Sequence, residues 1–329
     1  MFINNHNGLE LSTAMLINAA EHRGIEVEIL DLEDNFIRLT KGDRIEYIKQ
    51  ATRTSADTYI APLIMENKEV TKLVLREKGI NVPAGIKVKS AAEAMAHYGG
   101  YQGKDIVIKP KSSNFGIGIV IHKNLQCENC YRTAVINAFS HDTSVLIEEF
   151  VPGKEYRFLV IGDEVVGILH RVPANVVGDG VHTIEALVTE KNQDPLRGKG
   201  YVTPLEKIQL GKTEIAFLSE QNKSIETIPE NGENVFLREN SNISTGGDSL
   251  DFTDEIIDDY KAIAVAAAHA VGARICGADI IIRDIQKKPD ATNYSIIELN
   301  FNPALHIHNY PFVGKNRHVD DKVLDLLGF

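Results

Sequence analysis

Alternating apolar and polar positions divide this chain into short strands and amphipathic helices. Residues 12–23 have the apolar spacing of a helix and are followed by Gly24, a frequent helix end. Residues 25–30 alternate apolar and acidic side chains, which is typical of a half-buried strand. Further helices are predicted at residues 66–78 and 90–98, and further strands at residues 105–110, 119–121, 145–150, 156–161 and 165–171. The pattern predicts an α+β protein.

Polar segments follow these strands. Residues 192–211 are polar and rich in helix and strand breakers, so we expect them at the surface. Residues 238–247 contain Asn, Ser, Thr and two adjacent glycines, which predicts a mobile loop. A long helix is predicted at residues 253–270, with a buried stripe of Ile256, Ile257, Tyr260, Ile263, Ala264 and Ala267. Two apolar strands follow, at residues 277–282 and 297–303.

These last two strands carry polar side chains in an otherwise apolar setting. Glu298 and Asn300 are two positions apart, so in a strand they face the same side. Asp279 lies in the preceding apolar run. Carboxylate and amide oxygens suit Mg²⁺, which completes its shell with waters and phosphate oxygens. Alone, such a pair is more often a solvated strand face, and a lone Asp is usually a turn former. Upstream features favour a metal–phosphate site.

A lysine and a small-residue turn form the first of these features. Lys109 ends an apolar strand, and the turn that follows contains Ser113 and Gly116. A lysine in this position can reach phosphates, and the backbone N–H groups of the turn can cover them. The alternative is a surface hairpin with a chance lysine.

Two further strands end in charged residues. Glu148 and Glu149 lead into Val151 and Glu155, where strand-edge backbone can pair with adenine and a carboxylate can bind ribose hydroxyls. The alternative is an ordinary acidic strand end. Arg171 ends another strand, and its permanently charged fork suits a triphosphate or a developing oxyanion.

Composition excludes several classes of protein. The 329 residues are 43% hydrophobic, enough for more than one lobe with its own core. A net charge of −11 argues against a general binder of nucleic acids or anionic membranes. No apolar run approaches the roughly 20 residues that span a bilayer, and no signal-peptide pattern opens the chain, so we expect a cytoplasmic protein. The sequence contains no P-loop, Rossmann glycine motif, nucleophile elbow or zinc-protease helix motif.

The three cysteines fit a reducing compartment, because their number is low and odd. Cys127 and Cys130 form a lone Cys-x-x-Cys without a second pair, so structural zinc is not expected, and a metal or redox role is left open. Cys276 lies in an apolar stretch, as a small core residue does.

The order of these motifs resembles the ATP-grasp ligases, which bind ATP between two α+β lobes. The resemblance implies a short N-terminal α/β segment at 1–65, an N-lobe at 66–148 and a C-lobe at 149–329. It also implies two Mg²⁺ or Mn²⁺ ions. In this sequence the family's phosphate lysines fall on Lys68 and Lys109, its hinge on 148–151, its ribose acid on Glu155, and its metal ligands on Asp279, Glu298 and Asn300.

Three stretches narrow the resemblance. Residues 171–184 look like the branch that holds cyanophycin synthetase and the C-terminal glutathione synthetase module of bifunctional bacterial enzymes. Residues 237–251 (LRENSNISTGGDSLD) and 300–317 (NFNPALHIHNYPFVGKNR) look specifically like that module. The resemblance implies ATP-dependent ligation of γ-glutamylcysteine and glycine through an acyl phosphate. The implied catalytic residues are Arg171, Arg238 and Asn242, and the implied substrate contacts are Asn302, His306 and His308.

Two alternatives stay open. One is another ATP-grasp carboxylate–amine ligase, such as a cyanophycin-synthetase-like enzyme, and the other is a non-catalytic ATP-binding subunit. The chain begins where the second module of the bifunctional enzymes would begin, so a separate enzyme that makes γ-glutamylcysteine is expected. A homodimer is also left open.

Overall fold

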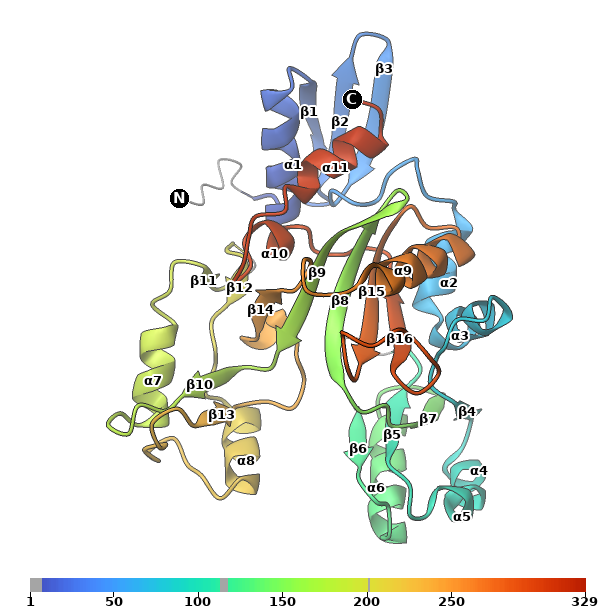
Figure 1. The fold of residues 1–329 in the computed structure, drawn as a ribbon, viewed down its shortest axis with the longest axis vertical. Helices are drawn as coiled ribbons and strands as arrows, with labels where there is room; N and C mark the ends of the chain where they lie inside the picture. The colour runs from blue at the N-terminus through green and yellow to red at the C-terminus, as the bar shows by residue number, and fades with distance from the viewer. Residues whose placement is uncertain (1–7, 113–117, 201) are drawn as a thin grey trace.

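The computed structural model describes residues 8–112, 118–200 and 202–329 (Figure 1). The predicted phosphate contacts Ser113 and Gly116 lie outside these residues. Within them, the strands form sheets of five, four and three strands, together with two two-stranded ribbons.

The N-terminal part is a small antiparallel sheet covered by helices. Its strands are β1 (Glu26–Asp31), β2 (Phe36–Lys41) and β3 (Arg44–Lys49). Helix α1 (Leu11–His22) packs on this sheet, and the C-terminal helix α11 (Val319–Leu326) returns to lie beside α1 (Figure 1). Their shared core includes Leu16, Ile17, Ile37, Leu39, Ile48 and Val323. The two ends of the chain are therefore joined in one core.

A four-stranded antiparallel sheet with the order β4-β7-β5-β6 follows. The strands are β4 (Gly85–Val88), β5 (Ile106–Pro110), β6 (Val120–His122) and β7 (Val145–Glu149). Helices α4 (Ala91–Ala96), α5 (Tyr98–Tyr101) and α6 (Glu128–Phe139) share its core. Ser90 caps α4, since its Oγ accepts a hydrogen bond from the N–H of Glu93 at 3.1 Å.

The helix predicted at residues 66–78 is present as α3 (Lys68–Glu77), and its start is two residues later than predicted. A separate helix, α2 (Ile60–Glu66), precedes it, and Asn67 lies between the two. Asn67 has an extended backbone (φ −99°, ψ 92°), and its side chain accepts a hydrogen bond from the N–H of Val70. An asparagine that caps a new helix explains the break, because its side-chain oxygen satisfies a donor at the start of α3.

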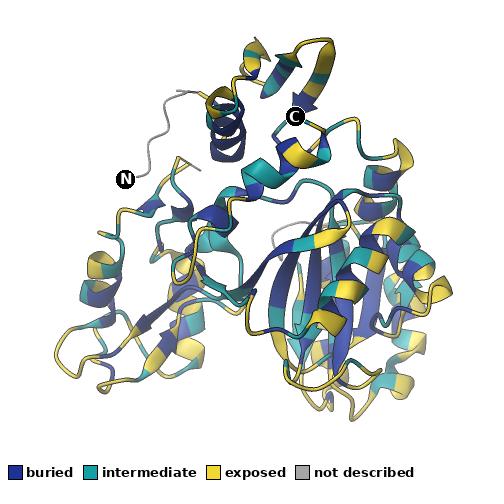
Figure 2. Ribbon diagram, turned by 45° about the horizontal axis from the view of Figure 1, so that its top comes forward, coloured by how far each residue is buried: buried dark blue, intermediate teal, exposed yellow. Residues whose placement is uncertain are grey.

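The largest sheet is antiparallel with the order β14-β9-β8-β15-β16. The strands are β8 (Lys154–Ile161), β9 (Glu164–Val172), β14 (Asp248–Asp251), β15 (Ile275–Ile282) and β16 (Tyr294–Asn300). Helix α9 (Asp258–Ala270) covers one face, where Phe158 and Val160 are buried. Leu159 and Ile161 face the other way, toward the N-terminal core, as strand alternation requires. The two innermost strands, β8 and β15, are mostly buried, and Figure 2 shows this part of the sheet in dark blue.

Helix α9 begins at Asp258, and the predicted start at residue 253 is wrong. Thr253 is held in a turn, because Asp251 Oδ1 accepts hydrogen bonds from its N–H and its hydroxyl group. The hydroxyl oxygen of Thr253 also accepts a hydrogen bond from the N–H of Ile168 in β9. These contacts favour a turn over a first helical turn.

Between β9 and β14 lies a small unit with its own core, which we call the inserted subdomain (residues 174–237). It contains β10 (Asn175–Val177), α7 (Ile184–Lys191), β11 (Arg197–Gly198), β12 (Leu205–Glu206), α8 (Lys212–Glu220) and β13 (Asn234–Phe236). The prediction that residues 192–211 lie at the surface is wrong for Arg197, Leu205 and Ile208, which are buried. Arg197 and Leu205 are paired across the parallel ribbon of β11 and β12, and Ile208 packs in the core of the subdomain. Two short helices complete the structure, η1 (Ile243–Thr245) and α10 (His306–Asn309).

The cysteines differ from the pattern expected in a reducing compartment, because two of them are bonded to each other. Cys127 and Cys130 are joined in a disulfide at the start of α6, and Cys276 is free and buried, as expected. Among the residues that the structure describes, no helix is long and apolar enough to cross a membrane. The division at residues 65 and 148 stays a prediction. The four-stranded sheet lies between these two positions, and the five-stranded sheet follows the second.

Candidate active site

A cleft of about 1220 Å³ is lined by the four-stranded sheet, the five-stranded sheet and the inserted subdomain. Many residues that the sequence predicts for the site line it, although they are far apart in the chain. They are Lys68, Lys109, Glu148, Glu149, Val151, Glu155, Arg171, Arg238, Asn242, Asp279, Glu298, Asn300, Asn302 and His306. His308 is not among the lining residues.

The three predicted metal ligands lie side by side on β15 and β16. Asp279 is the cross-strand partner of Glu298, and Asn300 Nδ2 lies 3.3 Å from Asp279 Oδ2. Asp279 is also the cross-strand partner of Arg157 in β8, so these side chains share the sheet face opposite α9. Strand pairing thus brings together groups that are more than 100 positions apart in the chain.

Arginines compensate the buried carboxylate of Asp279. Arg157 donates hydrogen bonds to both carboxylate oxygens, and Arg171 Nη2 lies 3.1 Å from Oδ2. Burial alone would raise the pKa of Asp279, but the charges of Arg157 and Arg171 hold this pKa below its usual value. Asp279 is therefore ionised at neutral pH.

These residues fit a divalent cation. Two carboxylates and one amide offer hard oxygen ligands in one cleft, with room for waters or phosphate oxygens. The cations that now face them, among them Lys68 at 3.4 Å from Glu298, mark a concentration of negative charge. Across the described ranges, no three His, Cys, Asp or Glu side chains are placed to hold a metal ion. A metal ion bound here would take its protein ligands from these two carboxylates and from the amide of Asn300.

A buried triad of Lys72, Glu148 and Lys109 lies at another part of the cleft, which Glu148 and Lys109 line. Glu148 lies between the two lysines, with Lys109 Nζ 2.9 Å from its Oε2 and Lys72 paired to its Oε1. Burial would raise the pKa of Glu148, but the charges of Lys109 and Lys72 lower it. Burial and the charge of Lys109 lower the pKa of Lys72 to about 8.

Lys72 was not predicted from the sequence. Its signal is its position four residues after Lys68, which places both lysines on one face of α3. Arg157 was also missed. Its signal is a lone charge within the apolar run of β8.

The loop at 240–247 touches the site through Ser241, whose hydroxyl donates to Glu155 Oε2 at 3.1 Å. Glu155 is also paired with Arg171. Before the loop, Arg238 Nε lies 2.5 Å from Glu214 Oε1 in α8. The predicted loop is therefore connected both to the main sheet and to the inserted subdomain.

The predicted substrate contacts lie where the cleft meets the N-terminal part. Asn302 Oδ1 accepts from Thr52 Oγ1 at 2.6 Å, and His306 Nδ1 lies 3.0 Å from Ser12 Oγ. Burial lowers the pKa of His306 to about 4 and that of His308 to about 3. Both rings are therefore neutral at pH 7. His308 is almost completely buried.

Arg53 lines the same end of the cleft and was also missed. Its guanidinium lies over the ring of Phe301, 5.1 Å from the ring centroid, and Phe301 directly follows Asn300. Stacking on a ring leaves the in-plane N–H donors of an arginine able to bind a carboxylate.

Comparisons with known proteins agree with this geometry. Residues 65–179 match a RimK-like ATP-grasp domain, and residues 7–60 match an ATP-grasp-like domain. The chain is 57% identical over 322 residues to the glutathione biosynthesis bifunctional protein of Clostridium perfringens, and 54% identical over 321 residues to that of Desulfotalea psychrophila. These alignments cover 98% of this chain and 41% of each relative.

A solved structure shows the same similarity. The bifunctional glutathione synthetase of Pasteurella multocida superposes with a TM-score of 0.78 at 47% identity, over 97% of this chain and 44% of that one. The chain thus spans less than half the length of these relatives. ATP-grasp proteins in general use ATP with divalent metal ions. The chain is therefore an ATP-grasp protein, similar over nearly its whole length to part of the bifunctional glutathione biosynthesis proteins.

Proposed function

We propose that this chain is a glutathione synthetase, which joins the cysteinyl carboxylate of γ-glutamylcysteine to the amine of glycine at the expense of ATP. The observation that carries the proposal is the cleft, which combines phosphate-binding cations with a carboxylate–amide metal site in a chain 57% identical to part of a glutathione biosynthesis protein. The proposed reaction also requires another enzyme that supplies γ-glutamylcysteine.

ATP would lie along the cleft from the end of β7 to β16. The strand edge at Glu149–Val151 suits adenine, and Glu155 suits the ribose hydroxyls. Lys68 and Lys109 reach the phosphates. Asp279, Glu298 and Asn300 would hold one or two Mg²⁺ or Mn²⁺ ions, which offset phosphate charge when bound.

The cysteinyl carboxylate takes the γ-phosphoryl group of ATP and becomes an acyl phosphate. The glycine amine then attacks the acyl carbon, and phosphate leaves. Arg171 and Arg238 stabilise the negative charge of the phosphoryl group, while Asn242 and its loop exclude water. This route needs no covalent bond to the enzyme.

Arg53 binds the acid substrate in this proposal. It lines the cleft beside Phe301, next to the metal-binding strand, where the acyl phosphate would form. The γ-glutamyl end of the substrate carries a carboxylate that does not react. A charge-assisted hydrogen bond from Arg53 would hold this carboxylate and orient the substrate.

The test is ADP release with Mg²⁺ and ATP, in the presence of γ-glutamylcysteine and glycine separately and together, with detection of the product by mass. Strong stimulation only with both substrates, together with the mass of glutathione, is the expected result. ADP release with a different acid–amine pair would keep the ligase mechanism and overturn the substrates. Tight ATP binding without turnover with any pair would overturn the enzyme proposal.

A further inference from the structure

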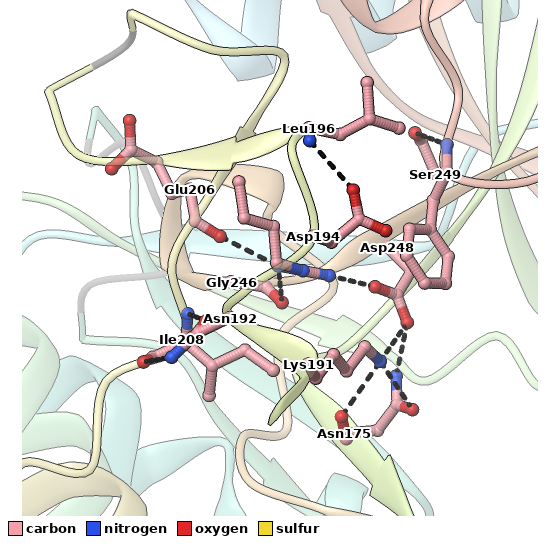
Figure 3. Close-up of polar contacts among 12 residues, drawn as sticks. Asn175, Lys191, Asn192, Asp194, Leu196, Glu206, Ile208, Gly246, Asp248 and Ser249 are labelled. Carbon is pink, nitrogen blue, oxygen red and sulfur yellow. Dashed lines mark hydrogen bonds and ion pairs between the residues drawn. The ribbon is translucent and has the colours of Figure 1, made fainter. Parts of the chain in front are cut away.

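A buried polar cluster joins the inserted subdomain to the end of the 240–247 loop (Figure 3). Its centre is Asp248, the first residue of β14. Asp248 Oδ2 accepts hydrogen bonds from Asn175 Nδ2 at 2.9 Å and from Lys191 Nζ at 2.7 Å. Asp248 Oδ1 is paired with Arg197. Three residues of the inserted subdomain therefore converge on one carboxylate of the main sheet.

Arg197 also binds the loop itself. Its Nη1 donates to the carbonyl oxygen of Gly246 at 3.0 Å and to that of Glu206 at 2.8 Å. The side chain of Arg197 is completely buried. One guanidinium thus connects three segments: the last turn of the loop, β12, and the first residue of β14. Glu206 of β12 lines the cleft.

Close packing leaves the end of the loop little freedom. Gly246 has a φ of +93°, and a Cβ added there would lie 2.7 Å from the Cα of Ile208. A Cβ at Gly247 would lie 2.7 Å from the carbonyl oxygen of Val172. The other end of the loop is held by the ion pair of Arg238 with Glu214. Both ends are therefore attached to the inserted subdomain, while residues 240–244 line the cleft.

We propose that Arg197 is a positioning residue for ligation, which fixes the loop on the inserted subdomain so that residues 240–244 shield the acyl phosphate from water. This inference rests on the proposed function. In the productive reaction, the amine nitrogen attacks the acyl carbon, the bond from that carbon to the phosphate oxygen breaks, and amide and phosphate form. In the wasteful reaction, water attacks the same carbon, and the free acid and phosphate form. A loosened loop favours the second reaction.

Arg197→Lys tests whether the loop position controls the balance between ligation and hydrolysis, because it removes the contacts to the loop and keeps the positive charge. A lysine lacks the planar fork that bonds Gly246, Glu206 and Asp248 together. We expect the ratio of ADP released to peptide product formed to rise by about tenfold, because a small displacement of a closing loop has large effects on rate. A side chain with only a structural role would lower both quantities in proportion and leave the ratio unchanged.

The matched control is Arg317→Lys. Arg317 is also a largely buried arginine that is paired with an acid of β14, since its Nη2 lies 2.6 Å from Asp251 Oδ2. Neither Arg317 nor Asp251 lines the cleft. Asp248→Asn and Asp251→Asn form a second matched pair with nearly unchanged side-chain shape, for use if the lysine variants fail to fold. Thermal unfolding verifies that each variant is folded at the assay temperature.

The inference is supported if Arg197→Lys or Asp248→Asn raises the ADP-to-product ratio and the matched control leaves it near one. It is overturned if the ratio stays near one in these variants, or if the controls raise it equally. Failure of the proposed function is a different result, because the unaltered protein would then form no glutathione. If that protein joins another acid–amine pair, the ratio is measured with that pair.

Discussion

Replacing Glu148 with glutamine tests the buried lysine triad directly. Glu148→Gln removes the negative charge between Lys72 and Lys109 and preserves the shape of the side chain. All three side chains are at most 10% exposed, so water cannot replace the lost charge. The two lysines then face each other across a neutral amide in a poorly solvated site.

The expected loss has two parts. Removal of one member of a buried ion pair costs about 3–5 kcal/mol of folding free energy, and we expect the lower end because Lys72, whose pKa is about 8, can release its proton. The pKa values of both lysines should fall, because the carboxylate that favours their charged forms is gone. A less charged Lys109 should weaken ATP binding by about tenfold, which corresponds to about 1.4 kcal/mol.

The assays are denaturant unfolding and calorimetric titration with ATP at pH 7. The matched control is Glu128→Gln, which removes an exposed ion pair with Arg132 on α6 at 3.5 Å. That pair should contribute less than about 1 kcal/mol and have no effect on ATP binding. The reasoning is refuted if Glu148→Gln binds ATP within twofold of the original affinity and loses no more stability than the control.

Three further predictions concern the metal site, the substrate and pH. Glu298→Ala should reduce ATP turnover by about a hundredfold or more even at saturating Mg²⁺, and near-normal turnover would remove Glu298 from the metal site. Arg53→Gln should raise the KM for γ-glutamylcysteine by about tenfold with an unchanged KM for ATP, and an effect confined to ATP would contradict the assigned contact. Because the pKa values of buried His306 and His308 are lowered from 6.5 to about 4 and about 3, the unfolded chain binds more protons as pH falls. Stability should therefore decrease from about pH 6.5 toward pH 4, by up to about 1.4 kcal/mol per pH unit for each histidine. His308→Asn should reduce the slope of unfolding free energy against pH, and an unchanged slope would exclude this account.

The regular periodicity of apolar residues made the main strands predictable. Side-chain caps and turns set the helix starts that the periodicity did not predict. Strands such as β5 and β8 follow from their apolar runs, because each is buried on at least one face. Asn67 interrupts a pattern that is otherwise helical, because its side chain caps a new helix. The start of α9 depends on Asp251 in strand β14, because the carboxylate of Asp251 accepts hydrogen bonds from Thr253 and holds it in a turn. A periodicity argument does not include such contacts.

In the cleft, residue types could be predicted and their partners could not. The spacing of Glu298 and Asn300 predicts a shared face, and the structure places both beside Asp279. No local pattern predicts that Arg157 binds Asp279, because the contact depends on the pairing of β8 with β15. The same holds for Arg197, which lies in a stretch with the pattern of a polar surface and is buried among Glu206, Gly246 and Asp248.

The overall charge of −11 gives no guide to this cleft, because its charges are arranged as local pairs. Asp279 faces two arginines, Glu148 faces two lysines, and Glu298 faces Lys68. Under the proposed function, each pair offers a cation to a phosphate or an acyl phosphate, which would take over part of the role of the carboxylate. A nucleotide with its metal would then enter by exchange of ion-pair partners, which limits the cost of an uncompensated buried charge. The net charge counts all charged residues, most of which lie outside the cleft. The ion pairs of individual residues are therefore a better guide to function than the net charge.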